Sequence, residues 1–289
     1  MTDILLVGGT GRVGAGVAAH LDEAGLGYAV GSSRPDAARH RFADVRHADL
    51  RRPETLAEAL DGITVAFLVT PLGPDETDCG MAFLDAAAAA GVRKIVYVAI
   101  MNIDAMTEIP HFATKAPIRD RLLADGPHVV ADANFFMQND AMVAPVIGQG
   151  VYPLPIGSVG VNSVDARDVS AVCARALTSD ALDGRAVPVC GGTVVTGASA
   201  ADAYAKALGR PVRYGGDDVE AFSRQMAATL PPMPAQVAEW IQEDFRLMMA
   251  VTQAEGCLAT PEQLSECEAA LGRPPRRYQD FVAELSAGL

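Results

Sequence analysis

Short apolar runs alternate with segments of helical periodicity from Ile4 to Ala131. The first run, Ile4–Val7, has four consecutive aliphatic residues, a pattern typical of a strand buried on both faces of a sheet. Because a helical segment follows each run at a short distance, the pattern predicts an α/β fold with a doubly wound parallel sheet. The further predicted strands are 28–30, 42–45, 64–69, 94–99 and 128–131, and the predicted helices between them begin near residues 12, 53, 75 and 111.

The pattern changes beyond Gly150. A helix over 165–177 and a strand over 187–189 are predicted to return to the main sheet, after a short strand at 161–164. We therefore expect a Rossmann domain over 1–150 and a smaller, mostly helical part over 151–289, of which 161–190 packs back on the first domain. The helices predicted there are 200–208, 219–230, 235–255, 261–271 and 278–285, and the prolines between 231 and 234 predict a break that is interpreted as a lid hinge.

Glycines at positions 8, 11 and 14 follow the first strand and lead into the first helix. In this position glycines let the backbone turn tightly and approach a pyrophosphate, whose charge is met by the free N–H groups of the helix start. The alternative is a tight turn that binds nothing. The sequence favours a dinucleotide site, formed by Gly8, Thr10, Gly11, Arg12, Val13 and Gly14.

The end of the second predicted strand indicates which dinucleotide binds. An acid at this position accepts from the adenosine 2′-hydroxyl, whereas an arginine accommodates a 2′-phosphate. Here Ser33 and Arg34 occupy it, and no acid occurs before Asp36. The sequence therefore predicts NADP(H) as cofactor, the alternative being a solvated loop arginine.

Ligands of doubly wound sheets lie beyond the carboxyl ends of the strands. Of the segments expected at these ends, the one at 49–50 should frame the adenine and the one at 69–71 should pass beneath a ribose. The segment that begins at Asn134 should line the same ligand cleft. Further candidate cofactor contacts are therefore Asp49, Leu50, Val69, Thr70, Pro71, Asn134 and Phe136.

Composition narrows the partners of the chain. The balance of 23 Lys and Arg against 36 Asp and Glu, a net charge of −13, argues against a nucleic-acid surface. No apolar run is long enough to span a bilayer, and the start lacks the form of a signal peptide, so we expect a soluble cytoplasmic protein. The five cysteines have no CxxC spacing and the histidines no metal-ligand spacing, which favours free thiols and no metal. We expect a small-molecule substrate, no membrane partner, and a monomer or homodimer.

Nearly the whole chain resembles the NmrA-like group of atypical short-chain dehydrogenases/reductases. The resemblance implies an NADP(H)-binding Rossmann domain with a smaller helical part that closes over the nicotinamide. It also implies that Lys115 holds the nicotinamide ribose. The motifs that carry it, in chain order, are Val7–Gly14, Ser33–Pro35, Leu68–Pro71, His111–Lys115, Asn134–Asn139, Val164–Val169 and Leu271–Arg276.

One motif departs from the wider superfamily, whose typical members use Tyr-xxx-Lys. Here His111 stands in the tyrosine position, one helical turn before Lys115. We interpret Lys115 as the residue that orients the ribose, and His111 or water as the proton donor. A conjugated acceptor needs a positioned acid least, so the leading hypothesis is an NADPH-dependent reductase of a small conjugated, quinonoid or aromatic carbonyl compound. Two alternatives stay open, an NADP(H)-binding redox sensor without catalysis and a redox-neutral isomerase or cyclase.

Overall fold

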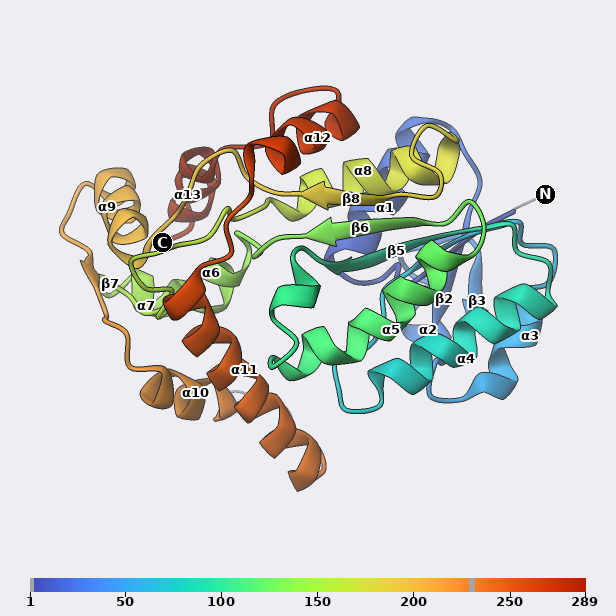
Figure 1. Ribbon diagram of the computed structural model, residues 1–289, viewed down its shortest axis with the longest axis horizontal. Helices are drawn as coiled ribbons and strands as arrows, with labels where there is room; N and C mark the ends of the chain where they lie inside the picture. The colour runs from blue at the N-terminus through green and yellow to red at the C-terminus, as the bar shows by residue number, and fades with distance from the viewer. Residues whose placement is uncertain (1–2, 229–231) are drawn as a thin grey trace. The chain divides into compact units, whose positions relative to one another are not determined.

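A seven-stranded parallel sheet organises the first part of the chain (Figure 1). The structure is a computed structural model that describes residues 3–228 and 232–289. Hydrogen-bonded neighbours follow the order β3-β2-β1-β4-β5-β6-β8, so the strand order reverses beside β1. Such a reversal is where open α/β sheets bind ligands. The strands are β1 (Ile4–Val7), β2 (Ala29–Ser32), β3 (Val45–His47), β4 (Val65–Leu68), β5 (Lys94–Ile100), β6 (Val129–Ala133) and β8 (Ala186–Val189).

Fifteen α- and 3₁₀-helical segments are assigned within the described residues. Those that follow the strands up to β6 are α1 (Arg12–Glu23), α2 (Pro35–Ala38), η1 (Pro53–Thr55), α3 (Leu56–Ala59), α4 (Glu76–Ala89), η2 (Ile103–Ala105) and α5 (Pro110–Ala124). The later ones are α6 (Asn139–Met142), α7 (Ala144–Ile147), α8 (Ala166–Thr178), α9 (Gly197–Leu208), α10 (Val219–Ala227), α11 (Ala235–Glu255), α12 (Pro261–Leu271) and α13 (Tyr278–Ser286). None of the described helices is long and apolar enough to cross a membrane.

Helices cover both faces of the sheet. On one face, buried side chains of α3, α4 and α5 join those of β1, β4 and β5 in one hydrophobic core, which includes Phe83 and Ile118. On the other, α1 lies against α8: the Ser170 hydroxyl donates to the Val13 carbonyl at 2.9 Å. A Cβ at Gly16 would lie only 2.4 Å from that hydroxyl oxygen, so glycine permits this close approach.

The chain folds into two compact units, each built from three segments that alternate along the sequence. Unit 1 comprises residues 1–100, 114–132 and 166–187, and unit 2 comprises residues 101–113, 133–165 and 188–289. The expected division was a single boundary at residue 150, with 161–190 packing back. Residues 166–187 thus belong with the first hundred residues, whereas 133–150 group with the C-terminal helices.

Unit 2 is built around a buried acid. In it, β7 (Val151–Tyr152) pairs in parallel with β9 (Arg213–Tyr214). The Asp140 carboxylate is 2% exposed and accepts hydrogen bonds from three buried phenols, those of Tyr152 and Tyr204 at 2.9 Å and that of Tyr278 at 2.5 Å. Four elements, α6, β7, α9 and α13, are thereby joined at one carboxylate.

We expect Asp140 to make unit 2 less stable as the pH rises. Burial raises the pKa of Asp140 to about 6, against the opposing effect of the three phenols. The folded state therefore binds a proton that the unfolded state has already lost between about pH 4 and 6. Relative to Asp140→Asn, the wild-type free energy of unfolding should fall by about 2 kcal/mol from about pH 4.5 to 7. Denaturant titrations measure this difference, with the exposed Asp202→Asn on α9 as control; a difference that is flat with pH would contradict it.

The predicted fold class is confirmed, while three local elements differ from their predictions. The strand predicted at 42–45 begins only at Val45, because turns of α2 continue to Phe42. The helix predicted from Pro53 is a 3₁₀ turn followed by the four residues of α3. The strand predicted at 161–164 is a set of isolated bridges, because the backbone N–H groups of Val161, Asn162 and Val164 bond to three different segments, at Val195, Cys257 and Phe135. The predicted break at 231–234 begins at Pro231, outside the described residues.

Candidate functional site

The turn between β1 and α1 requires its glycines. Gly8 has φ +82°, in the left-handed region that favours glycine. A Cβ at Gly14 would lie 2.3 Å from the Gly8 carbonyl oxygen and 2.6 Å from Gly9 Cα, so a side chain there would displace the backbone. At Gly11 the nearest atom to an added Cβ, the Gly8 oxygen, is 3.3 Å away. Gly8 and Gly14 therefore shape the turn, whereas a side chain at Gly11 would need only a small shift of the Gly8 carbonyl.

The start of α1 offers amide groups to an anion. The first helical hydrogen bond runs from Ala15 to Gly11 at 2.8 Å, so the amides of Arg12, Val13 and Gly14 precede it. Within the described residues no side chain caps this end, and its first turn holds no acid. Such an end binds phosphate groups. Burial lowers the pKa of Arg12, and this guanidinium has no ion pair among the described residues. The turn, with exposed Thr10 beside it, fits a pyrophosphate.

Arg34 is exposed beyond the end of β2. Its backbone N–H donates to the Ser32 hydroxyl at 3.1 Å, which fixes the loop before α2. In the described part of the chain its guanidinium has no carboxylate partner, while nearby Arg39 is paired with Asp36 at 2.5 Å. Exposed Ser33 lies next to it. A guanidinium and a hydroxyl at this strand end fit a 2′-phosphate.

Two further segments end at the same edge of the sheet. Asp49 is engaged locally, since its carboxylate accepts from the backbone N–H of Arg51 at 3.0 Å, and Leu50 beside it is buried. After β4, the Val69 N–H donates to Val7 at 3.1 Å and continues the pairing with β1. Pro71 follows half-buried. Roles for Asp49, Leu50, Val69 and Pro71 at the cofactor stay predictions.

Lys115 on α5 is held by a buried carboxylate. Its Nζ lies 2.6 Å from Glu76 Oε1 and donates to the Thr70 hydroxyl at 3.1 Å. Glu76 is fully buried and also accepts from the hydroxyls of Thr70 at 2.5 Å and Thr114 at 2.6 Å. Burial lowers the pKa of Lys115, but its electrostatic and hydrogen-bond interactions with Tyr97 and Glu76 outweigh burial and raise that pKa. Lys115 is therefore a fixed cation at the carboxyl edge of unit 1.

His111 begins the same helix and is paired with an acid of α11. Its Nδ1 lies 2.7 Å from Asp244 Oδ1, and its backbone N–H donates to the same oxygen at 2.8 Å. The His111 side chain is 14% exposed and that of Asp244 only 1%. The Phe112 ring and the imidazole form a T-shaped pair with a centroid distance of 4.6 Å. The histidine predicted as a proton donor is thus oriented by a carboxylate that the sequence did not single out.

The predicted contacts Asn134 and Phe136 have partners within unit 2. The Asn134 amide donates to the Cys257 carbonyl at 3.1 Å, and its oxygen accepts from the Phe135 N–H at 2.6 Å. Phe136 forms a bridge with Val164. Both residues hold local structure, and their contact with a cofactor stays a prediction.

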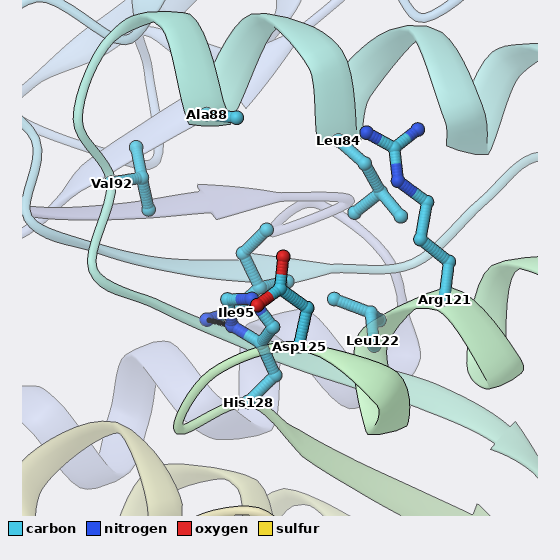
Figure 2. Close-up of a pocket in the computed structure, with 8 residues that line it drawn as sticks. All are labelled: Leu84, Ala88, Val92, Ile95, Arg121, Leu122, Asp125 and His128. Atoms are coloured by element: carbon cyan, nitrogen blue, oxygen red, sulfur yellow. Dashed lines mark hydrogen bonds between the residues drawn. The ribbon is translucent and has the colours of Figure 1, made fainter.

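A small cavity at the other edge of the sheet is no rival site (Figure 2). It lies between the C-terminal turns of α4 and α5, near the first residues of β5. Its volume of about 80 Å³ corresponds to two or three water molecules. His128 at its wall accepts from the Ile95 N–H at 3.1 Å, and burial lowers the pKa of its imidazole. The five cysteines are free thiols in this structure, and all five are buried. No group of side chains that could hold a metal ion occurs in the described residues.

Comparison with known proteins decides the family. A model of the NmrA-like family matches residues 1–273. The chain belongs to the NmrA-like family. The resemblance stated from the motifs is thereby confirmed.

Two relatives of this NmrA-like protein and one solved structure with the same fold are informative. The NAD(P)H azoreductase of Xenophilus azovorans is 34% identical over 300 residues and 98% of each chain. The (4-alkanoyl-5-oxo-2,5-dihydrofuran-3-yl)methyl phosphate reductase of Streptomyces griseus is 31% identical over 97% of each. The solved NADPH-dependent quinone oxidoreductase of Escherichia coli, complexed with NADPH, superposes with a TM-score of 0.80 at 20% identity, over 98% of this chain and 99% of that one. The last of these shows the shared fold.

The most important side chains missed by the sequence analysis of this NmrA-like protein are Glu76 and Asp244. Glu76 lies in the first turn of α4, where an acid is ordinarily a helix-end residue. Asp244 is buried three residues after buried Ile241 on α11. A charged residue on the apolar face of a predicted helix was the available signal for Asp244. For Glu76 no local pattern exists, because its partner Lys115 is 39 positions away.

Proposed function

We propose that the protein is an NADPH-dependent reductase of small conjugated or aromatic acceptors such as quinones and azo compounds. The observation that carries the proposal is the β1–α1 turn, in which three amides precede the first helical bond and a Cβ at Gly14 would meet backbone. The predicted cofactor, NADP(H), agrees with the azoreductase that shares 34% of its residues. Both relatives above 30% identity are reductases.

The cofactor is assigned to residues of unit 1. We place the pyrophosphate at the amides of Arg12, Val13 and Gly14, and the 2′-phosphate at Ser33 and Arg34. Lys115 holds the nicotinamide ribose through its ammonium, which Glu76 fixes at 2.6 Å. The remaining predicted contacts of unit 1, at the ends of β3 and β4, frame the adenosine and the riboses.

The bound cofactor supplies a hydride to the acceptor. The chain must then provide one proton, so that a quinone becomes a hydroquinone or an azo group a hydrazine. His111 precedes Lys115 by one turn of α5, which makes it the candidate donor. The protein would thus be an atypical short-chain reductase that lacks the tyrosine of Tyr-xxx-Lys. A conjugated acceptor spreads the charge left by hydride delivery, which fits the absence of that phenol.

Steady-state assays test the proposed reaction against its alternatives. NADPH consumption is measured with a quinone, an azo compound, an enone and an aldehyde, and NADH is run in parallel. We expect turnover with the quinone or the azo compound and little with the aldehyde. Tight NADPH binding without turnover of any acceptor would instead support the redox sensor. Product formation without net NADPH consumption would support an isomerase or cyclase.

Arg34→Ala is expected to abolish the preference for NADPH over NADH. A charge-assisted pair with the 2′-phosphate contributes about 1.5–3 kcal/mol, so the NADPH dissociation constant should rise roughly 10- to 100-fold while that of NADH stays nearly constant. Isothermal calorimetry measures both. Arg39→Ala is the matched control, because this arginine is five positions further along the chain and its guanidinium is paired with Asp36. Equal affinity of the wild type for the two cofactors would refute the assignment.

His111→Ala is expected to reduce turnover while leaving cofactor affinity unchanged. A general acid contributes at least about 10²-fold with poor acceptors, and a conjugated acceptor lowers that demand, so we expect a loss of about 10²-fold or less. Single-turnover rates and NADPH calorimetry give the two quantities. Full activity of the variant would show that water, and not His111, donates the proton.

A further inference from the structure

Asp244 lies on the buried face of α11 and bonds to His111 twice. One oxygen, Oδ1, accepts the backbone N–H at 2.8 Å and lies 2.7 Å from the ring Nδ1. Both residues belong to unit 2. Because a carboxylate can only accept, Nδ1 carries the proton of this bond. The proton that His111 can transfer is therefore the one on Nε2.

The second carboxylate oxygen gives independent evidence that Asp244 is more than a helix cap. Asp244 Oδ2 is buried and has no hydrogen-bond partner among the described residues. A buried carboxylate with one unsatisfied oxygen is unfavourable unless a cation lies beside it. The only titratable ring that its other oxygen contacts in the described structure is His111. An imidazolium there would compensate the buried charge.

We propose that Asp244 is a positioning residue that holds His111 in the orientation required for proton transfer. Its Oδ1 fixes Nδ1–H, and its charge stabilises the imidazolium, whose Nε2 proton passes to the acceptor after hydride delivery. The transfer breaks the Nε2–H bond and forms one O–H or N–H bond on the reduced acceptor. The neutral imidazole then regains a proton from solvent. The inference rests on the proposed reductase function.

The alternative is that Asp244 only caps the start of α5 through the His111 backbone N–H. Asparagine separates the two roles. Its carbonyl oxygen still accepts the backbone N–H, so the cap is kept, whereas the charge that stabilises the imidazolium is lost. If Asp244 has only a structural role, Asp244→Asn should react at the wild-type rate. If Asp244 positions His111, the variant should react more slowly.

A double-mutant cycle on the full chain tests the proposal. Single-turnover rates with a quinone are compared for wild type, Asp244→Asn, His111→Ala and the double variant. We expect Asp244→Asn to slow the reaction roughly tenfold or more, with the quinone KM and NADPH affinity unchanged, and to add nothing in the His111→Ala background. Glu239→Gln removes an exposed acid from the same helix and is the matched control.

Two results would overturn the proposal. One is wild-type rates in Asp244→Asn, and the other is a further loss when Asp244→Asn is added to His111→Ala. ¹⁵N shifts of the His111 ring give a readout that needs neither turnover nor a stable variant. They should show Nδ1 protonated in the wild type, and a neutral ring protonated only at Nε2 would contradict the geometry. An inactive wild type would contradict the proposed reductase function itself. A loss of activity confined to the variants tests only the role of Asp244, so the two failures can be distinguished.

Discussion

Lys115→Ala is expected to abolish turnover and to lower the free energy of unfolding by about 3–5 kcal/mol. The stability loss follows from Glu76, which is fully buried and whose Oε1 lies 2.6 Å from the ammonium. Removing the lysine leaves that carboxylate with hydroxyl partners but no counter-charge. The loss of turnover follows from the proposed contact between Lys115 and the nicotinamide ribose. Chemical denaturation and steady-state rates measure the two effects.

A paired variant separates the two effects of Lys115. Lys115→Met combined with Glu76→Gln removes both charges at similar volume. One of the hydroxyls of Thr70 and Thr114 can still donate to the glutamine oxygen, while the other turns to accept from its NH2 group. We expect it to recover most of the lost stability, since a buried ion pair replaced as a unit costs little. Turnover and NADPH affinity should not recover. Recovery of both stability and turnover would show that Lys115 is only a structural partner of Glu76.

Gly11→Val is expected to weaken NADPH binding at least ~100-fold, or about 2.7 kcal/mol, while the protein stays folded. Gly11 has extended backbone (φ −78°, ψ 177°), which valine adopts, and an added Cβ meets no atom closer than 3.3 Å. The branched side chain would, however, stand at the start of α1, where the pyrophosphate must approach the amides. The change should therefore affect ligand binding far more than the fold, which needs only a small shift of the Gly8 carbonyl.

Gly14→Val is the comparison for Gly11→Val. Its Cβ would lie 2.3 Å from the Gly8 carbonyl oxygen, so this variant should lose about 1–3 kcal/mol of stability in addition to cofactor affinity. Thermal unfolding and NADPH calorimetry on both variants provide the test. Normal NADPH affinity in folded Gly11→Val would mean that the turn is structural and binds no pyrophosphate.

The parts of the fold that follow from the sequence are those with a strong local pattern. The buried strand Ile4–Val7 and the helices α11 and α12 agree with their predicted bounds, because apolar periodicity and proline or glycine ends define them. The predictions that differ, at 42–45 and 161–164, concern short segments. There, turns or backbone bonds to several separate segments take the place of continuous strand pairing.

The residues of the candidate site likewise divide into those that a local sequence pattern predicts and those that it does not. The glycine turn and Arg34 can be predicted from the sequence because each depends on a few adjacent residues. The carboxylates that hold Lys115 and His111 are not, since Glu76 and Asp244 lie 39 and 133 positions from their partners. Their burial is decided by packing between helices, which periodicity does not specify. The sequence thus indicates the groups that meet a ligand more readily than the groups that hold them.

The most direct test of the proposed reductase is the kinetic isotope effect on a single turnover with a quinone. NADPH carrying deuterium at C4, in either the pro-R or the pro-S position, is compared with unlabelled NADPH in enzyme excess. If the protein transfers a hydride from one face of the nicotinamide, one label slows NADPH oxidation as a primary effect and the other leaves it nearly unchanged. Bound NADPH that is not oxidised, or an oxidation rate equal for all three cofactors, would contradict hydride transfer by this protein.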